Sequence, residues 1–439
     1  MKKSAVLVGI VTLVGCSPVA IKKLECPPDA KYSSSQIEPS IAINPQNPDQ
    51  VIAGSVLNDF YYTNDGGKTW SSESLRSKYG VWGDPVLMFD TKNTAYYFHL
   101  ASYKKTSHLD RIVCQKAKIS EEGELRADMF DEGTFTEPNG TKVQDKHWTV
   151  VNQKTNEIYM TWTQFDEYNS KEAEDSTIIV FSKSADQGAT WSTPKRISFY
   201  AGDCLDGDNT VEGAVPAVGP NGEIYVTWTG PKGLVFQKSL DGGETWMPKE
   251  SIIEKQYGGW ALDIPGIYRA NGLPILKCDL SNGTSRGTLY LNWCDQQNGE
   301  EDTDVWLMKS TDGGETWSSR VRVNQDNSKR HQFFTWMALD QSSGYLYFVY
   351  YDRRSTSENE TETYISYSMD GGETFTDLPI SKSPFTPDPD LFFGDYLNID
   401  AVKGQLYAIW PELNKGEIEL FVGKTDQGKI VKHYLKNRE

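Results

Sequence analysis

The pattern Ser-x-Asp-x-Gly-x-Thr-Trp recurs along the chain at intervals that point to a repeated structural unit. Its full-length copies span residues 63–70, 184–191, 239–246, 310–317 and 368–375, and a shortened copy spans residues 425–428. The aspartates of these boxes are 121, 55, 71, 58 and 56 residues apart. A nearly constant period of this length predicts a repeat architecture in which each unit packs on its neighbours.

The long first interval equals about two periods, and residues 120–123 near its middle form a degenerate copy with Glu122 in place of aspartate. The chain therefore contains seven units. Within each box, Asp-Gly-Gly favours a tight turn, because glycine adopts positive φ freely and aspartate bonds the backbone that follows it. The Thr-Trp that follows begins a strand, so each box is predicted to be the tip of a hairpin.

Each unit carries four strand signals, most clearly in the fourth unit at residues 212–218, 222–228 and 233–239, followed by the strand after the box. No segment shows a sustained helical period. Roughly 50–60 residues per four-stranded sheet is the spacing of a β-propeller. We predict an all-β, seven-bladed propeller of four-stranded antiparallel blades over residues 32–439, with six blades as the alternative count.

The first residues have the pattern of an export signal. Lys2 and Lys3 precede an apolar run that is too short to span a membrane, and it ends in Leu-Val-Gly-Cys at Cys16. This ending resembles a bacterial lipobox, which predicts a lipoprotein signal peptide at 1–15, a lipidated Cys16 and a tether at 16–31. The expected location is the outer membrane or cell surface, or the periplasm. An ordinary signal peptide is the alternative.

Composition narrows the class of partner. The net charge of −17 and the pI of about 4.9 argue against nucleic acid binding, which requires a basic surface. Five cysteines remain after Cys16, without the Cys-x-x-Cys spacing typical of zinc sites. We expect a monomer that binds a glycan, is anchored to a membrane through Cys16 and needs no cofactor.

Propeller geometry separates the candidate functional residues from the boxes. The boxes lie between the third and fourth strands of each blade, so they share one face, whereas the innermost strands begin at the opposite face around the central channel. Acidic residues stand at the beginning of five of these innermost strands, namely Glu38, Asp84, Asp145, Glu212 and Asp395. Other candidates near the same opening are His147, Tyr396, Arg269, Arg330, Trp336 and Arg353.

Carboxylates that converge on one opening raise one another's pKa values, which suits general acid–base chemistry. The same oxygens are also suitable ligands for a hard cation such as calcium. A purely structural interpretation stays open for each of them, because an acidic side chain at a strand start can bind loop amides and the repeat can have duplicated it.

The boxes resemble the Asp-box (BNR) repeats of the sialidase superfamily, and the resemblance extends over nearly the whole chain after Cys16. It implies a β-propeller, often on exported proteins that handle glycans. Sialidases bind the substrate carboxylate with arginines, the first of them at the start of the first blade, where this chain has Glu38. Tyr396 is placed similarly to the sialidase tyrosine nucleophile. The resemblance therefore implies the fold, but not classical sialidase activity.

Three hypotheses follow. The first is an exo-acting glycoside hydrolase with acid and base among Asp84, Asp145, Glu212 and Asp395. In this hypothesis Arg269, Arg330 and Arg353 orient a sugar acid or sulfate, and Trp336 stacks on a sugar. The second is a polysaccharide lyase that uses His147, Tyr396 and Arg353 on a uronate. The third is a propeller that binds a glycan or protein without catalysis.

Overall fold

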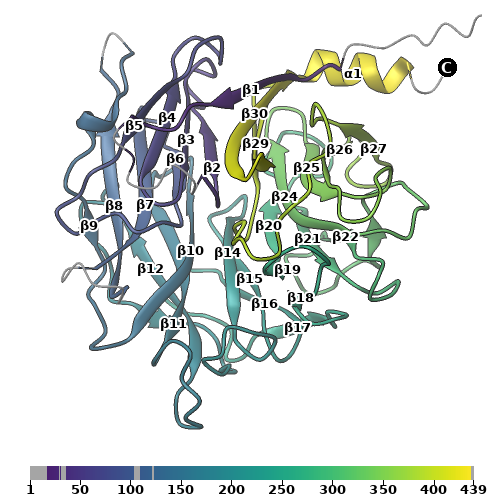
Figure 1. Ribbon diagram of the computed structural model, residues 1–439. Coiled ribbons are helices and arrows are strands. Elements are labelled where there is room, and N and C mark those ends of the chain that lie inside the picture. Colours follow the sequence, from purple (N-terminus) through teal and green to yellow (C-terminus); the bar gives the residue numbers. More distant parts are fainter. Residues whose placement is uncertain (1–16, 29, 31–35, 103–108, 121–122, 437–439) are drawn as a thin grey trace, which may run out of the picture.

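The computed structural model describes residues 17–28, 30, 36–102, 109–120 and 123–436, and these form a β-propeller (Figure 1). Seven four-stranded antiparallel sheets surround one axis within this described part of the chain. Cys16 and Glu122 lie outside the described residues. The predicted seven blades are confirmed, and the six-blade alternative is wrong.

Six blades use strands that follow one another in sequence, from the axis outwards. The first three are β2 (Ser40–Ile43), β3 (Val51–Ser55), β4 (Asp59–Thr63), β5 (Ser71–Ser74); β6 (Val86–Phe89), β7 (Thr94–Ala101), β8 (Arg111–Lys118), β9 (Thr134–Phe135); and β10 (Val143–Val151), β11 (Ile158–Phe165), β12 (Thr177–Ser184), β13 (Lys195–Arg196). The next three are β14 (Glu212–Val218), β15 (Ile224–Thr229), β16 (Leu234–Ser239), β17 (Ser251–Glu254); β20 (Ile275–Cys278), β21 (Leu289–Asp295), β22 (Asp304–Ser310), β23 (Val321–Arg322); and β24 (Gln332–Asp340), β25 (Tyr345–Asp352), β26 (Glu362–Ser368), β27 (Thr376–Pro379).

The seventh blade joins the two ends of the chain. Its inner strands are β28 (Asn398–Val402), β29 (Gln405–Asn414) and β30 (Glu417–Asp426), and its outer strand is β1 (Ala20–Leu24). Five residue pairs align β1 antiparallel to β30, so the ring is closed by backbone hydrogen bonds. The predicted tether is therefore wrong at β1, because these residues are part of the propeller.

One helix, α1 (Gln427–Lys436), follows directly after β30. The shortened box expected at 425–428 is therefore a strand end and a helix start, not a hairpin tip. No strand follows it in the described residues, because the N-terminal strand β1 already pairs with β30. Helix α1 is also the one described α-helix in a chain for which no helical segment was predicted.

The full-length boxes form the predicted hairpin tips and also join neighbouring blades. The ring of Trp246 packs at 4.9 Å from Phe181 of the preceding blade, and Trp317 packs at 5.6 Å from Phe236 in the same way. A lysine on the third strand of a blade donates to the backbone carbonyl that follows the box aspartate of the next blade. This bond is 2.8 Å from Lys183 to Gly242 and 3.0 Å from Lys238 to Gly313.

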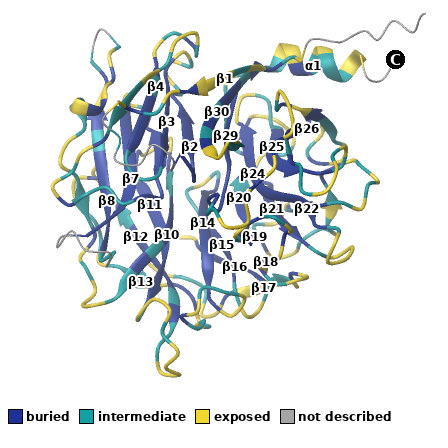
Figure 2. Cartoon of the chain, viewed as in Figure 1, coloured by how far each residue is buried: buried dark blue, intermediate teal, exposed yellow. Residues whose placement is uncertain are grey.

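Burial follows from this stacking of blades. Most strand residues are buried and exposure is concentrated in the turns (Figure 2). The innermost strands line a central cavity of about 280 Å³. Trp148, Trp336 and Tyr396 lie between this cavity and the face at which the innermost strands begin, with the Trp148 ring 4.4 Å from Trp336 and 5.1 Å from Tyr396. We call that face the mouth face and the opposite one the box face.

Candidate active site at the mouth of the propeller

The innermost strands begin with a repeated backbone conformation. One residue at the start of six of them has positive φ, namely Glu38 (51°), Asp84 (52°), Lys146 (46°), Gly213 (72°), Phe334 (54°) and Gly394 (87°). In β10, β14 and β24 the register of strand pairing also shifts near this point. Non-glycine residues rarely adopt this conformation, and it is common where side chains are aimed at functional sites.

This alignment corrects the expected equivalence of the five acidic residues. Glu38 and Asp84 occupy the positive-φ position itself. Asp145 and Glu212 precede it by one residue, and Asp395 follows it by one. The five carboxylates therefore lie near one another without being copies of a single repeat position, so duplication of one structural residue does not explain them.

Lys146 lies among these carboxylates and was not predicted as a site residue. Its Nζ lies 3.7 Å from Glu38 Oε1 and 4.0 Å from Asp84 Oδ2, and it donates a hydrogen bond to Asp395 Oδ2. The side chain is 8% exposed. A buried ammonium group requires compensating negative charge, and here carboxylates of the first, second and seventh blades supply it. Burial alone would lower the pKa of Lys146, but Asp395, Asp84 and Glu38 raise it well above its usual value.

Arg269 reaches the same site from the hairpin formed by β18 (Ala261–Leu262) and β19 (Ala270–Asn271). Its Nε lies 2.9 Å from Asp395 Oδ1, its Nη2 binds Asp395 Oδ2, and its Nη1 lies 2.8 Å from Asp206 Oδ2. Burial alone would raise the pKa of Asp395, but Lys146 and Arg269 outweigh it and lower the pKa to about 2. Asp395 was predicted to be catalytic. With this pKa and these partners it organises the two cations instead of exchanging protons.

The other carboxylates at the mouth receive few hydrogen bonds. Asp145 accepts one at 2.8 Å from its neighbour's backbone N–H, and neither Glu38 nor Asp84 accepts any from the described residues. Glu212 is fully buried, and neither of its side-chain oxygens has a hydrogen-bond partner. We call Glu38, Asp84, Asp145 and Glu212 the unsaturated carboxylates.

Burial and mutual repulsion shift the protonation of this group. Burial, followed by the charge of Asp84, raises the pKa of Asp145 to about 7, against the opposing effect of Lys146. Burial also raises the pKa of Glu38 well above its usual value, with Asp84 adding to the effect. The same holds for Glu212, where burial acts first and other carboxylates add to it. Asp145 is also partly exposed, so it combines solvent access with a pKa suited to general acid–base catalysis.

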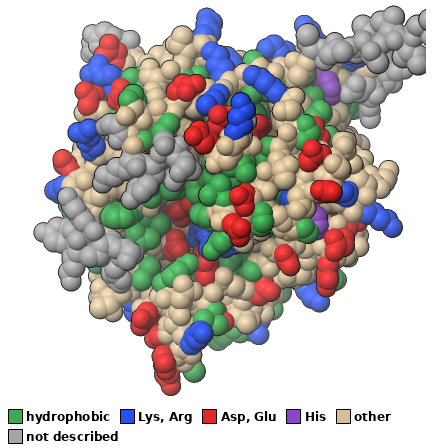
Figure 3. Space-filling view, viewed as in Figure 1, with side chains coloured by type: hydrophobic (Ala, Val, Ile, Leu, Met, Phe, Trp, Pro, Cys, Tyr) green, Lys and Arg blue, Asp and Glu red, His purple; other side chains and the backbone are tan. Residues whose placement is uncertain are grey.

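Figure 3 shows acidic and basic side chains gathered in a hollow near the middle of one face, bordered by hydrophobic side chains. Three aromatic residues lie beside the groups that form the site. Tyr168 is 37% exposed and its hydroxyl donates to Asp206 Oδ2 at 2.5 Å. Tyr268 is 61% exposed and packs at 6.1 Å from Phe392, and the Arg269 guanidinium lies 5.0 Å from the Phe392 ring.

Two predicted catalytic residues lie in the packed core instead. His147 is 1% exposed, and burial, followed by the charge of His99, lowers its pKa to about 3. Neither of its ring nitrogens has a hydrogen-bond partner, so it is a neutral packed histidine. Tyr396 is 6% exposed, and burial raises its pKa well above the usual value, which disfavours a tyrosinate. Its ring faces Lys146, whose Nζ lies 5.7 Å from the ring centre.

Trp336 does not form the expected platform for a sugar. Its side chain is 6% exposed and its ring packs on Trp148 below the mouth. Trp336 lies in β24, two residues after the positive-φ residue Phe334. This position in the strand turns its indole toward the axis.

Arg353 and Arg330 lie apart from the acidic residues. Arg353 is buried, and it donates from Nε to Thr361 at 3.0 Å and from Nη1 to the carbonyl of Pro265 at 2.7 Å. Arg330 donates to the backbone carbonyl of Glu358. Neither arginine contacts the site around Lys146, so the structure does not support their expected role in orienting a substrate.

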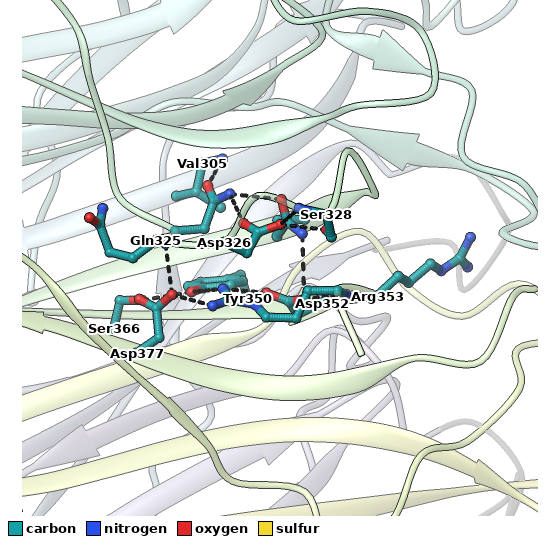
Figure 4. Close-up of polar contacts among 12 residues, drawn as sticks. Val305, Gln325, Asp326, Ser328, Tyr350, Asp352, Arg353, Ser366 and Asp377 are labelled. Atoms are coloured by element: carbon teal, nitrogen blue, oxygen red, sulfur yellow. Dashed lines mark hydrogen bonds and ion pairs between the residues drawn. The ribbon is translucent and has the colours of Figure 1, made fainter. Parts of the chain in front are cut away.

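Figure 4 shows the side chains at the end of β25 and the polar contacts around them. Arg353 extends away from a polar network that includes Asp352, Asp377 and Tyr350. The neighbouring Arg354 joins that network, with its Nε 2.8 Å from Asp352 Oδ2. This network links strands β25, β26 and β27 of the sixth blade and is saturated with hydrogen bonds, which is typical of a structural role.

Clusters of potential metal ligands, disulfides and helices able to span a membrane are absent from the described residues. No group of three or more histidine, cysteine, aspartate or glutamate side chains is arranged there to hold a metal ion. The five cysteines Cys26, Cys114, Cys204, Cys278 and Cys294 are free thiols. No helix in this part of the chain is long and apolar enough to cross a membrane.

Comparison with known proteins supports the fold. The family described as BNR/Asp-box repeat matches residues 61–72, and no curated protein sequence matches the chain. An ulvan lyase, which represents a new family of polysaccharide lyases, is similar over 91% of this chain and 96% of its own, with 13% identity and a TM-score of 0.51. A protein of unknown function from Dyadobacter fermentans is similar over 92% of this chain and 99% of its own, with 11% identity and a TM-score of 0.48. The NanB sialidase from Streptococcus pneumoniae is similar over 86% and 83%, with 10% identity and a TM-score of 0.47.

Proposed function

Because this chain is a seven-bladed β-propeller whose residues 61–72 match the BNR/Asp-box repeat, we propose that it acts on glycans as an exo-acting glycoside hydrolase. The observation that carries the proposal is Asp145, a partly exposed carboxyl with a pKa of about 7 among other carboxylates at the mouth. Hydrolysis of a glycosidic bond requires one carboxylic acid that protonates the leaving oxygen and one carboxylate on the other side of the sugar.

In the proposed mechanism Asp145 is the general acid, because a large fraction of it is protonated near neutral pH. Asp84 is the second carboxylate and acts as base or nucleophile, since no described residue donates a hydrogen bond to it. Glu212 is a positioning residue, because it is fully buried and Asp145 is one of the carboxylates that raise its pKa. Lys146 holds Glu38 and Asp84 in place on the opposite side.

A polysaccharide lyase is the second candidate, and the ulvan lyase of similar fold is the reason to test it. A lyase needs a base beside the uronate and a cation that neutralises its carboxylate. Here His147 is buried and neutral, and both Lys146 and Arg269 already bind Asp395. The side chains at the mouth therefore favour hydrolysis over elimination.

The test is to incubate the protein with neutral, amino, uronate and sialylated oligosaccharides and to identify the products by mass spectrometry. We expect new reducing ends without the ultraviolet absorbance of an unsaturated sugar. Asp145→Asn should lower the rate at least ~100-fold, the usual contribution of a general acid. Glu315→Gln, which changes a charge on the box face, is the matched control and should keep the rate. Absence of any product, or an unchanged rate in Asp145→Asn, contradicts the proposal.

We also propose that Cys16 carries a lipid that anchors the exported protein to a membrane. The support is the Leu-Val-Gly-Cys sequence that ends the apolar run. Incorporation of labelled palmitate in wild type and its loss in Cys16→Ser tests this. Equal labelling of both proteins would contradict it.

A further inference from the structure

The unsaturated carboxylates form an acceptor-rich and donor-poor site. Four carboxyl groups offer eight oxygens, and the described residues donate to them one hydrogen bond, from the backbone N–H of Lys146 to Asp145. An approaching ammonium group stabilises the ionised form of such carboxyl groups, and an ionised carboxylate can only accept hydrogen bonds, so the site is complementary to a ligand that supplies donors and positive charge.

We infer that the site binds a glycan carrying a free primary amine, with its ammonium group bound by Glu38 and Asp84 and with Asp145 left free as the acid. The inference rests on the proposed glycan activity and names its substrate class. An ammonium group carries three donors and no acceptor, which is the complement of the oxygens available here. It would also relieve the repulsion between carboxylates that belong to different blades.

The cations at the mouth argue against an anionic substrate. Lys146 donates to Asp395, and Arg269 holds both Asp395 and Asp206. A sialate, uronate or sulfate group would have to take these cations from carboxylates that already bind them in the buried site. The site holds six acidic groups, namely Glu38, Asp84, Asp145, Asp206, Glu212 and Asp395, against two cations, so a bound positive charge is favoured over a further negative one.

Glu212 is the independent observation that points to a ligand. It is fully buried and both of its oxygens lack a partner. The carboxylates that raise its pKa are Asp206 and Asp145, so it faces the same site. A buried carboxyl group without hydrogen-bond partners is costly, and a ligand group that bonds to it offsets that cost.

The aromatic side chains around the site favour an amino sugar over a simple amine. Tyr168 and Tyr268 are exposed and lie beside Asp206 and Arg269. Exposed aromatic rings offer flat apolar faces with a polar hydroxyl at the edge, which suits the C–H face of a sugar ring. A linear polyamine has no such face, so it would use the carboxylates alone.

The experiment is calorimetric titration of the full chain with tetrasaccharides whose sulfur-linked glycosidic bonds resist hydrolysis. The tetramer of glucosamine should bind at least about tenfold more tightly than the tetramer of N-acetylglucosamine, the difference expected for one charge-assisted hydrogen-bonding group. A uronate tetramer should not bind. Equal or tighter binding of the acetylated or uronate tetramer overturns the inference.

Matched variants locate the binding group. Asp84→Asn should weaken binding of the glucosamine tetramer about tenfold, whereas Glu315→Gln, with the same change of charge on the box face, should change it less than about twofold. Glu38→Gln gives a second reading if Asp84→Asn fails to fold. If Glu315→Gln weakens binding as much as Asp84→Asn does, only the overall charge of the protein matters. That result contradicts the proposed binding site.

Two further results separate this inference from the hydrolase proposal. A tetralysine peptide that binds as tightly as the glucosamine tetramer overturns the sugar part of the inference. Amine-selective binding without release of reducing ends from the oxygen-linked tetramer supports the inference and contradicts the hydrolase. Hydrolysis of neutral or acidic glycans without a preference for amines supports the hydrolase and contradicts the inference.

Discussion

Aspartates on the two faces of this propeller have opposite surroundings. On the box face Asp241 accepts hydrogen bonds from Ser239 Oγ at 2.8 Å, the Thr245 backbone N–H at 2.8 Å and Thr245 Oγ1 at 2.6 Å, and these lower its pKa to about 2. On the mouth face Asp145 accepts a single bond from a backbone N–H, and burial together with Asp84 raises its pKa to about 7.

The difference shows that the supply of donors, and not the residue type, separates structural from functional carboxylates in this fold. In each full-length box the serine or threonine two residues before the aspartate and the threonine four residues after it donate hydrogen bonds to the carboxylate. The turn therefore supplies all the donors that its aspartate needs. The mouth carboxylates come from different blades and have no such local donors. They are therefore available for a proton or a ligand.

The largest expected effect compares one lysine from each face. Lys146→Met should lower the free energy of unfolding by about 3–5 kcal/mol, because it leaves buried Glu38 and Asp84 without a counter-ion and Asp395 with Arg269 alone. Lys238→Met removes a partner of the exposed Glu315. It should lower the free energy of unfolding by only about 1 kcal/mol. Urea unfolding measures both. Equal losses would show that the mouth network is no more important to stability than a box contact.

The next effect tests the saturation of the boxes. Asp370→Ala removes bonds from Ser368 Oγ at 2.8 Å, the Thr374 N–H at 3.0 Å and Thr374 Oγ1 at 2.6 Å, and should cost about 1–2 kcal/mol. Glu373→Ala in the same turn removes an exposed ion pair and should cost about 0.5 kcal/mol or less. Thermal unfolding compares them, and a harmless Asp370→Ala would contradict a structural role for the box.

The pH dependence of stability gives a smaller effect with a defined sign. The pKa of Asp145 is about 7 in the folded protein against an ordinary value of 3.8, so the folded state holds its proton more tightly. Wild type should therefore lose stability relative to Asp145→Asn as pH rises from about 4 to 7, with no further relative change above that. Box aspartates have lowered pKa values and give the reverse sign, with stability lost only as pH falls toward 2. A constant difference between the two proteins from pH 4 to 7 would contradict the raised pKa.

The smallest effect concerns His147. Because it is buried, neutral and without hydrogen-bond partners, His147→Gln should leave the pH dependence of glycan turnover unchanged and the rate within about tenfold of wild type. Loss of a step near pH 6–7 from the rate profile would instead show that His147 takes part in proton transfer.

The sequence was sufficient to predict most of the fold, because the spacing of the boxes gives the number of blades and the turn residues of each box give the position of a hairpin tip. It did not predict that β1 (Ala20–Leu24) closes the seventh blade, since that pairing joins residues about 400 positions apart and leaves no local signal. The helix at Gln427–Lys436 was missed because it was taken for a shortened box.

Prediction of the site was partial for a related reason. The acidic residues and Arg269 were identified because strand order places them at one opening. Lys146 and Asp206 were missed, although Lys146 lies next to Asp145 and a lysine among converging carboxylates is a recognisable signal. Trp336 and His147 were wrongly placed at the site. A positive-φ residue near each of them changes which side chains point toward the core, and composition does not reveal this backbone conformation.

The most direct test of the contrast between the two faces is an NMR titration of the protein labelled with ¹³C at aspartate carboxyl groups. We predict one resonance that titrates near pH 7, is absent from Asp145→Asn and is retained in Asp241→Asn. The box aspartates Asp65, Asp241 and Asp312 should titrate near pH 2. If every aspartate of the wild type titrates below about pH 5, the mouth holds no group poised for proton transfer, and the account of this face as an active site is contradicted.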